Sequence, residues 1–213
     1  MVRRDIGVAT PDDETKYART RGRILDAAAY VLSRKGYAGT RLSDIAERVD
    51  IQTPAIYYYF ASRDDLIEEV MASGLADMRV HLQATLQALP PDTPAIDKIL
   101  IAAETHLRHE LEISDDTTAS IRNQGQIPTR LRARADREGD GYGALWRQLF
   151  DEAASTGQLR SDVDPRISQM LVLGALNWAA EWWVPRRTPL HAIVADAQRL
   201  IRSALEPSQP DVP

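Results

Sequence analysis

The segment IQTPAIYYYFASRDDL, residues 51–66, places three consecutive tyrosines between two helix-start signals. Thr53 is a favourable N-cap residue, and Pro54 fits the first helical position, where its missing N–H costs nothing. Ser62, followed three residues later by Asp65, reads as a capping box that opens another helix. The segment therefore predicts a short helix that ends near Phe60, directly followed by a long one.

Two further helices are predicted upstream. Apolar residues recur at three- and four-residue spacing over residues 21–35, and Gly36 then follows two cations, as is typical of a helix end. Thr40 is expected to cap a second helix through Val49, which Asp50 and Ile51 interrupt. Three short helices with a tight turn before the last form a helix-turn-helix arrangement, whose final helix lies in a DNA major groove.

The residue types of the third helix suit that role. A capped helix start offers free N–H groups and a partial positive charge to a phosphate. Tyr57 lies four residues after Thr53 on the same face. Its ring can touch a thymine methyl group and its hydroxyl can bind a phosphate. Ile56 and Phe60 are expected to hold the helix to the core, and Arg63 begins the next helix beside the same phosphates.

Charge is distributed unevenly along the 213 residues. The chain carries a net charge of −5, but residues 16–63 contain nine Lys and Arg against four acids, which makes this segment +5 and the remainder −10. A basic head on an acidic body can bind a polyanion locally. An uneven solvated surface would give the same totals, so charge alone does not decide between the two.

Composition excludes several other classes. The chain has no cysteine, which rules out disulfides and thiolate metal sites. No apolar run approaches the roughly 20 residues that span a bilayer, and the first 20 residues lack a signal-peptide core. We therefore expect a cytoplasmic protein with no membrane partner.

The segment RILDAAAYVLSRKGYAGTRLSDIAERVDIQTPAIYYYFASRDDLIEEVM resembles the DNA-binding domain of the TetR family of transcriptional regulators over about residues 20–71. The K-G-Y, T-x-L-x-D-I-A, I-Y-Y-x-F and S-R-D-D-L fragments, in this order, carry the resemblance. It implies a two-fold dimer that places two reading heads in successive major grooves of an operator. Residues implied to face bases are Thr53, Pro54, Ala55 and Tyr57. Residues implied to hold phosphates are Thr40, Arg41, Ser43, Tyr58 and Arg63.

Two positions depart from the family pattern. Asp50 stands where the turn usually has Gly, and Asp tolerates the left-handed conformation better than most residues. Tyr59 stands where many relatives have His. Packing against the first or fourth helix is an alternative role for Tyr58 and Tyr59.

The remainder of the chain also reads as helical, so the predicted class is all-α. A helix-turn-helix DNA-binding domain at 18–62 is followed by a helical ligand-binding and dimerisation domain at 63–206. The tails 1–17 and 207–213 are expected to be disordered. Within the body we predict helices over 62–89, 94–111, 114–122, 128–157, 164–184 and 189–205.

The last two helices are expected to form the homodimer contact. The segment 164–184 is apolar nearly all round, and a second subunit would supply the partners that such a helix needs. Its N-W-x-x-x-W pattern resembles a branch of the family that senses acyl-CoA thioesters or related lipid and steroid catabolites. The predicted ligand-binding residues are His106, Trp146, Phe150, Asn177, Trp178 and Trp182. Completion of the dimer core is an alternative role for Asn177, Trp178 and Trp182.

A pair of histidines and a set of four arginines offer two further candidate sites. His106 and His109 have a spacing that could hold a metal, but they match no zinc pattern, and a solvated or pocket-lining pair is the simpler reading. Some of the four arginines Arg122, Arg130, Arg132 and Arg134 could meet CoA phosphates at a pocket mouth, or form a solvated helix face.

Together these features predict a ligand-responsive DNA-binding regulator, with repression favoured by family frequency. Its expected partners are double-stranded operator DNA, a second copy of the chain and a small hydrophobic or acyl-CoA-type effector. No cofactor, metal or catalytic set is predicted, because the sequence has no Ser-His-acid arrangement and no phosphate-binding glycine loop. An all-helical ligand carrier or enzyme without DNA binding is the alternative.

Overall fold

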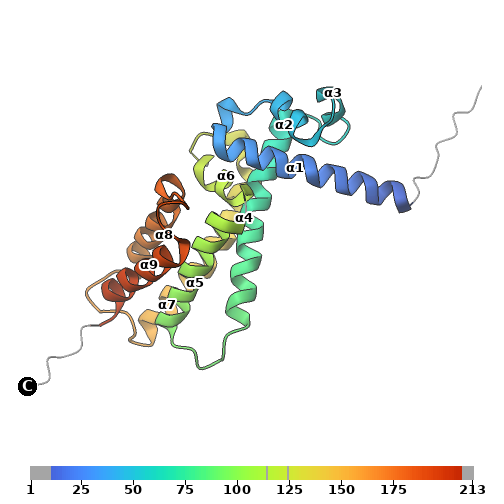
Figure 1. The fold of residues 1–213 in the computed structure, drawn as a ribbon. Coiled ribbons are helices and arrows are strands. Elements are labelled where there is room, and N and C mark those ends of the chain that lie inside the picture. Colours follow the sequence, from blue (N-terminus) through green and yellow to red (C-terminus); the bar gives the residue numbers. More distant parts are fainter. Residues whose placement is uncertain (1–10, 114, 124, 208–213) are drawn as a thin grey trace, which may run out of the picture.

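The computed structural model describes residues 11–113, 115–123 and 125–207. Within these ranges the chain forms nine α-helices and no strand, which confirms the all-α prediction (Figure 1). A small head of three helices sits at one end of an elongated body of six helices. The parts of the predicted tails at 1–10 and 208–213 lie outside the described residues.

The head consists of α1 (Pro11–Gly39), α2 (Leu42–Val49) and α3 (Thr53–Ile56). α1 begins well before residue 18, so residues 11–17 are helical and the prediction of a disordered tail there is wrong. The regular helix breaks at Gly36, whose φ of 68° favours glycine, as the sequence predicts. The amide of Tyr37, just after the break, donates to Asn123 Oδ1 at 2.9 Å and fixes the bend against the body.

The long helix α4 (Arg63–Gln87) leaves the head and runs down the body (Figure 1). Its predicted N-cap is confirmed, because the Ser62 hydroxyl accepts from the amide of Asp65 at 3.0 Å. Leu66, Ile67 and Val70 are buried in the head core, and Met78 and Leu82 in the body core. One rigid helix therefore belongs to both parts, and no boundary in packing falls at residue 62.

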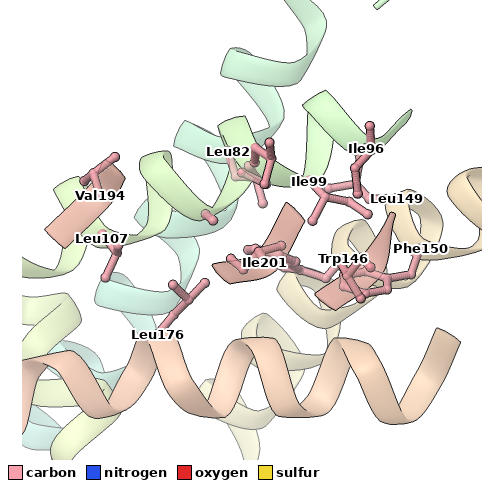
Figure 2. Close-up of a cluster of buried hydrophobic side chains, with 14 of the residues drawn as sticks. Leu82, Ile96, Ile99, Leu107, Trp146, Leu149, Phe150, Leu176, Val194 and Ile201 are labelled. Atoms are coloured by element: carbon pink, nitrogen blue, oxygen red, sulfur yellow. The ribbon is translucent and has the colours of Figure 1, made fainter. Parts of the chain in front are cut away.

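The body adds α5 (Ala95–Arg108), α6 (Asp115–Asn123), α7 (Ala133–Ser155), α8 (Pro165–Trp182) and α9 (Leu190–Leu205). A π-helical turn (His109–Ile113) follows α5, and a 3-10 turn (Thr129–Leu131) precedes α7. α8 starts as predicted, since Asp164 Oδ1 accepts from the amide of Ile167 at 2.9 Å. Figure 2 shows the body core, in which Trp146 and Phe150 of α7 pack among aliphatic side chains of the surrounding helices.

Candidate functional site

The third helix of the head has Gln52 at its N-cap, with Thr53 and Pro54 in the first turn. The prediction that Thr53 caps this helix is therefore wrong by one residue, and no side-chain cap bond forms. The α-helix ends at Ile56, but the turn continues, because the amide of Phe60 donates to the carbonyl of Ile56 at 3.0 Å. Ile56 and Phe60 are buried in the head core and anchor the turn, as expected.

The three tyrosines have different surroundings. Tyr57 and Tyr58 are 57% and 75% exposed, which is unusual for large side chains. Tyr59 is half-buried and packs on Tyr17 of α1, with ring centroids 5.0 Å apart. This agrees with the packing alternative for Tyr59. Tyr58 also touches Tyr17 edge-on at 5.7 Å, yet it leaves most of its surface free.

At the start of α2 the structure corrects the role of Thr40. Its side chain is buried and its hydroxyl donates to the Gly36 carbonyl at 2.8 Å, so it neither caps α2 nor faces a phosphate. Arg41 occupies the N-cap position without a side-chain cap bond. Arg41 and Ser43 are both exposed, and Asp50 adopts the left-handed conformation at φ 57° that the turn requires.

Arg63 is also placed differently from the prediction. Its Nε donates to the Thr40 carbonyl at 2.7 Å, another nitrogen donates to the Tyr37 carbonyl, and the third lies 3.2 Å from Asp64. The guanidinium also stacks over the Tyr37 ring. All three nitrogens are thus engaged inside the protein. Arg63 fixes the loop before α2 to the start of α4, rather than extending toward a phosphate.

The remaining predicted contact residues lie on the surface of the reading helix. Pro54 is exposed, while Thr53 and Ala55 are half-exposed beside Tyr57. The head thus exposes Arg41 and Ser43 at the start of α2 and Tyr57 and Tyr58 just after α3. An arrangement of a firmly anchored short helix with exposed polar and aromatic side chains fits insertion into a DNA groove.

The body contains a cavity of about 570 Å³ between α4, α5, α7 and α8. Apolar groups from α4 and α8, including Leu75, Met78 and Leu173, line part of it. Polar groups line the rest, including His106, Tyr142 and Asn177. A mixed lining of this size is typical of sites for small organic ligands.

The deepest polar group at this cavity is the buried His106. Its Nδ1 lies 2.8 Å from the Tyr142 hydroxyl, and its Nε2 lies 3.4 Å from Glu110 Oε2. Burial raises the pKa of Tyr142 and also the pKa of Glu110. Burial thus disfavours the ionised form of each group, and the Tyr142 hydroxyl can both donate and accept a hydrogen bond.

The predicted ligand residues divide into three groups. His106 and Asn177 line the cavity. Trp146 and Phe150 are fully buried core residues that do not reach its surface. Trp178 and Trp182 are 64% and 51% exposed on the outer side of α8 and do not line this cavity, so their role as a ligand clamp stays a prediction.

Sequence reasoning missed other lining residues, notably Tyr142, Arg147 and Gln169. A signal was present in the segment EGDGYG, residues 138–143, which puts three glycines into a helix where they cost stability. Gly139 and Gly143 line the cavity, where the missing side chains leave space.

The four arginines considered for CoA phosphates are placed elsewhere. Arg122 donates to the Ser33 carbonyl of α1 at 3.1 Å, donates to the Ala180 carbonyl of α8 and pairs with Glu181 at 3.2 Å. Arg130 pairs with Asp64, and Arg132 donates to the Ile127 carbonyl. None of the four, including the exposed Arg134, lines the cavity.

His109 is buried beside His81, with ring centroids 5.2 Å apart. Burial, and then the nearby His81 and His106, lower the pKa of His109 to about 4. In the part of the chain that the structure covers, no three His, Asp or Glu side chains are grouped so as to hold a metal ion. None of the helices described combines the length and the apolar character needed to cross a bilayer.

Comparison with known proteins agrees with this architecture. Residues 24–70 match the family model of bacterial regulatory proteins of the tetR family, and residues 92–201 match the tetracyclin repressor-like C-terminal domain. The fatty acid metabolism regulator protein of Bacillus subtilis (strain 168) is 21% identical over 166 residues, which cover 76% of this chain and 81% of that protein.

Two further relatives extend the comparison. The HTH-type transcriptional repressor KstR2 of Mycolicibacterium smegmatis is 22% identical over 186 residues, covering 85% of this chain and 87% of its own length. The crystal structure of AibR in complex with isovaleryl coenzyme A and operator DNA superposes with a TM-score of 0.76 at 18% identity. That superposition covers 85% of this chain and 97% of AibR.

The anchored helix α3 and the cavity in the helical body agree with the domains that the two family models describe. The C-terminal match alone spans more than half of the chain. The chain belongs to the TetR family and is a ligand-responsive DNA-binding transcriptional regulator.

Proposed function

We propose that this regulator is a homodimeric repressor that an acyl-CoA or related lipid-derived effector releases from its operator. The observation that carries the proposal is the cavity of about 570 Å³ in the helical body, whose lining combines apolar residues with polar groups such as His106 and Asn177. It suits a ligand with a hydrocarbon part and a carbonyl or hydroxyl group. The named functions of the relatives support this ligand class.

DNA contact is assigned to the exposed surface of α2 and α3. Thr53, Pro54, Ala55 and Tyr57 would face base edges, while Arg41, Ser43 and Tyr58 would hold phosphates. In a two-fold dimer the two reading helices would meet half-sites about 34–36 Å apart. Thr40 and Arg63 support this surface from behind through the bonds described above.

Dimerisation is assigned to the outer face of α8 and α9. Large apolar side chains are exposed there, including Leu171, Trp178, Trp182 and Leu200. A groove of about 550 Å³ between the two helices is lined by Leu171, Trp182 and Leu200. Such a contiguous apolar patch on an isolated chain marks an interaction surface, and a second copy would cover it symmetrically.

Release would follow from coupling between the cavity and the head. Helix α4 lines the cavity through Leu75 and Met78 and enters the head core through Leu66 and Ile67. A ligand that binds best when α4 is displaced would move the two heads away from their half-site spacing. The size of the shift is limited by the ligand's difference in affinity between the two arrangements.

The experiment is a fluorescence-anisotropy titration of DNA from upstream of the protein's own gene. We expect binding with a steep salt dependence, because phosphate contacts release counterions. Arg41→Ala should lower the slope of log affinity against log salt by about one. Arg186→Ala removes an equally exposed arginine beyond α8 and serves as the matched control. Equal slopes for the two variants would refute the assigned DNA surface.

A further inference from the structure

A second hollow of about 340 Å³ lies beside the main cavity, between α7 and the start of α8. Its walls include Arg147 and Asp151 of α7 and Pro165 and Arg166 of α8. Arg147 and Gln169 line both hollows. The two hollows are therefore neighbours, with these two side chains at the join.

Contacts with Gly143 fix the positions of Gln169 and Arg147 where the two hollows meet. Gln169 is buried, and its Nε2 donates to the Gly143 carbonyl at 3.4 Å, which ties α8 to α7. A Cβ atom at Gly143 would come 3.3 Å from a guanidinium nitrogen of Arg147, so this guanidinium lies back over the turn that borders the main cavity. A ligand leaving the cavity at this point would pass directly beside Arg147.

The two hollows differ in charge. Asp136 and Asp140 line the main cavity, where only Arg147 is basic. The second hollow has two arginines against the single Asp151. Among the residues that the structure describes, neither Arg147 nor Arg166 forms an ion pair or a side-chain hydrogen bond, whereas most other arginines of the body do.

Both arginines are also exposed, so they are available to a ligand from solvent. Arg166 and Asn177 are 11 positions apart on α8, which corresponds to roughly 16 Å at the helical rise of about 1.5 Å per residue. An elongated ligand that reaches Asn177 with its apolar part could therefore place an anionic group between the arginines.

We propose that Arg147 and Arg166 form an anion subsite that binds the phosphate groups of a CoA thioester, whose acyl part occupies the main cavity. This inference rests on the proposed function, which supplies the thioester class. Guanidinium groups bind phosphates through paired, charge-assisted hydrogen bonds, which are stronger than bonds between neutral groups. The arginines would thus select the thioester over a neutral lipid of the same chain length.

The test compares three probes by isothermal titration calorimetry: octanoyl-CoA, octanoyl-pantetheine without phosphates, and octanoate. The proteins are the full chain, the double variant R147Q/R166Q and the control R186Q/R187Q, which removes two exposed arginines beyond α8. We expect R147Q/R166Q to bind octanoyl-CoA about 10- to 100-fold more weakly, since two charge-assisted bonds are lost. Its affinity for octanoyl-pantetheine should equal that of the unaltered chain, and the control should match the unaltered chain with every probe.

Other results separate the two proposals. If the unaltered chain binds octanoyl-CoA and R147Q/R166Q binds it equally well, the subsite is refuted while the effector class stands. If octanoate binds as tightly as octanoyl-CoA and only R147Q/R166Q loses it, the arginines bind a carboxylate and the phosphate assignment is refuted. If CoA esters do not bind the unaltered chain at all, both the effector class and the subsite fail.

Discussion

The head and the body of this protein differ in how completely their buried polar side chains are hydrogen-bonded. In the head the buried hydroxyls donate to backbone carbonyls: Ser33 to that of Tyr30 and Thr40 to that of Gly36. In the body, ring nitrogens of His106, His109 and Trp146 are buried without a hydrogen-bond partner. Unpaired buried polar atoms cost stability, and ligand binding is one function that accounts for keeping them.

This difference matches the different roles proposed for the head and the body. A reading surface must hold its geometry against DNA, and a closed core with satisfied polar groups provides that rigidity. A ligand site must keep space and hydrogen-bonding capacity in reserve, at some cost in stability. Helix α6 joins the two regions, because Arg122 contacts both α1 and α8, and Asn123 binds the Tyr37 amide at the bend of α1.

The largest expected effect is a difference between the two regions in the free energy of unfolding. Trp146→Ala removes a fully buried side chain from the body core and should lower the free energy of unfolding by about 3–5 kcal/mol. Tyr58→Ala, on the exposed reading surface, should change it by less than about 0.5 kcal/mol. Urea unfolding followed by circular dichroism measures both. A comparable loss for Tyr58→Ala would mean that the tyrosine supports the head rather than serving as a free contact.

The second prediction concerns the joint between the regions. Arg122→Met removes the side chain that connects α8 to α1, so effector and operator should influence each other's binding less, with α4 as the remaining connection. Allosteric coupling is typically about 1–3 kcal/mol, a factor of about 5–150 in affinity. The ratio of operator Kd with and without octanoyl-CoA should fall toward one.

The control for that variant is Arg108→Met, which breaks surface ion pairs on α5 with Glu104 and Glu112. Its ratio should equal that of the unaltered chain. If Arg122→Met retains the full ratio, coupling passes through α4 alone.

The third prediction uses pH. Because the pKa of His109 is lowered to about 4 in the folded state, against an ordinary value near 6.5, only the unfolded chain takes up this proton between those values. Stability is therefore lost as pH falls from 6.5 to 4. The raised pKa of Glu110 acts in the opposite direction, so the comparison must be made between variants.

His109→Gln should remove an acid-dependent loss of about 1–3 kcal/mol between pH 6.5 and 4. His191→Gln, on the exposed surface of α9, is the control and should leave the profile unchanged. Melting temperatures across this pH range supply the measurement. Parallel profiles for His109→Gln and the unaltered chain would show that His109 titrates normally.

The smallest effect lies in the turn of the head. Asp50 holds φ at 57°, which costs a non-glycine residue free energy. Asp50→Gly should relieve this strain and stabilise the protein by about 0.5–1 kcal/mol, partly offset by the greater freedom of glycine in the unfolded chain. Thermal unfolding measures the change, and a destabilised variant would show that the Asp50 side chain makes a compensating contact.

The sequence predicted helix boundaries better than the roles of single side chains, for a physical reason. Helix starts and stops depend on local chemistry, so Gly36, Ser62 and Asp164 were placed correctly from neighbouring residues. Errors arose where a side chain turned to a distant backbone atom. Arg63 looks like a surface contact in sequence, but it binds the Thr40 and Tyr37 carbonyls, which only the folded chain brings near. Thr40 differs, because its partner is the Gly36 carbonyl one helical turn earlier.

The ligand site shows the same limit. Helical periodicity cannot tell a face that lines a cavity from one that meets a second subunit, because both are apolar. Asn177 and Trp178 are adjacent in sequence, yet Asn177 lines the cavity while Trp178 lies on the outer face of α8. Tyr142 went unnoticed because its contact with His106 spans 36 positions along the chain.

The most direct test of the account measures operator affinity and effector binding on the same sample. Anisotropy of labelled upstream DNA should show tight binding that octanoyl-CoA weakens by about tenfold or more, at thioester concentrations that calorimetry shows to saturate the protein. If octanoyl-CoA saturates the protein and operator affinity stays the same, the cavity does not control the head, and the central claim is contradicted.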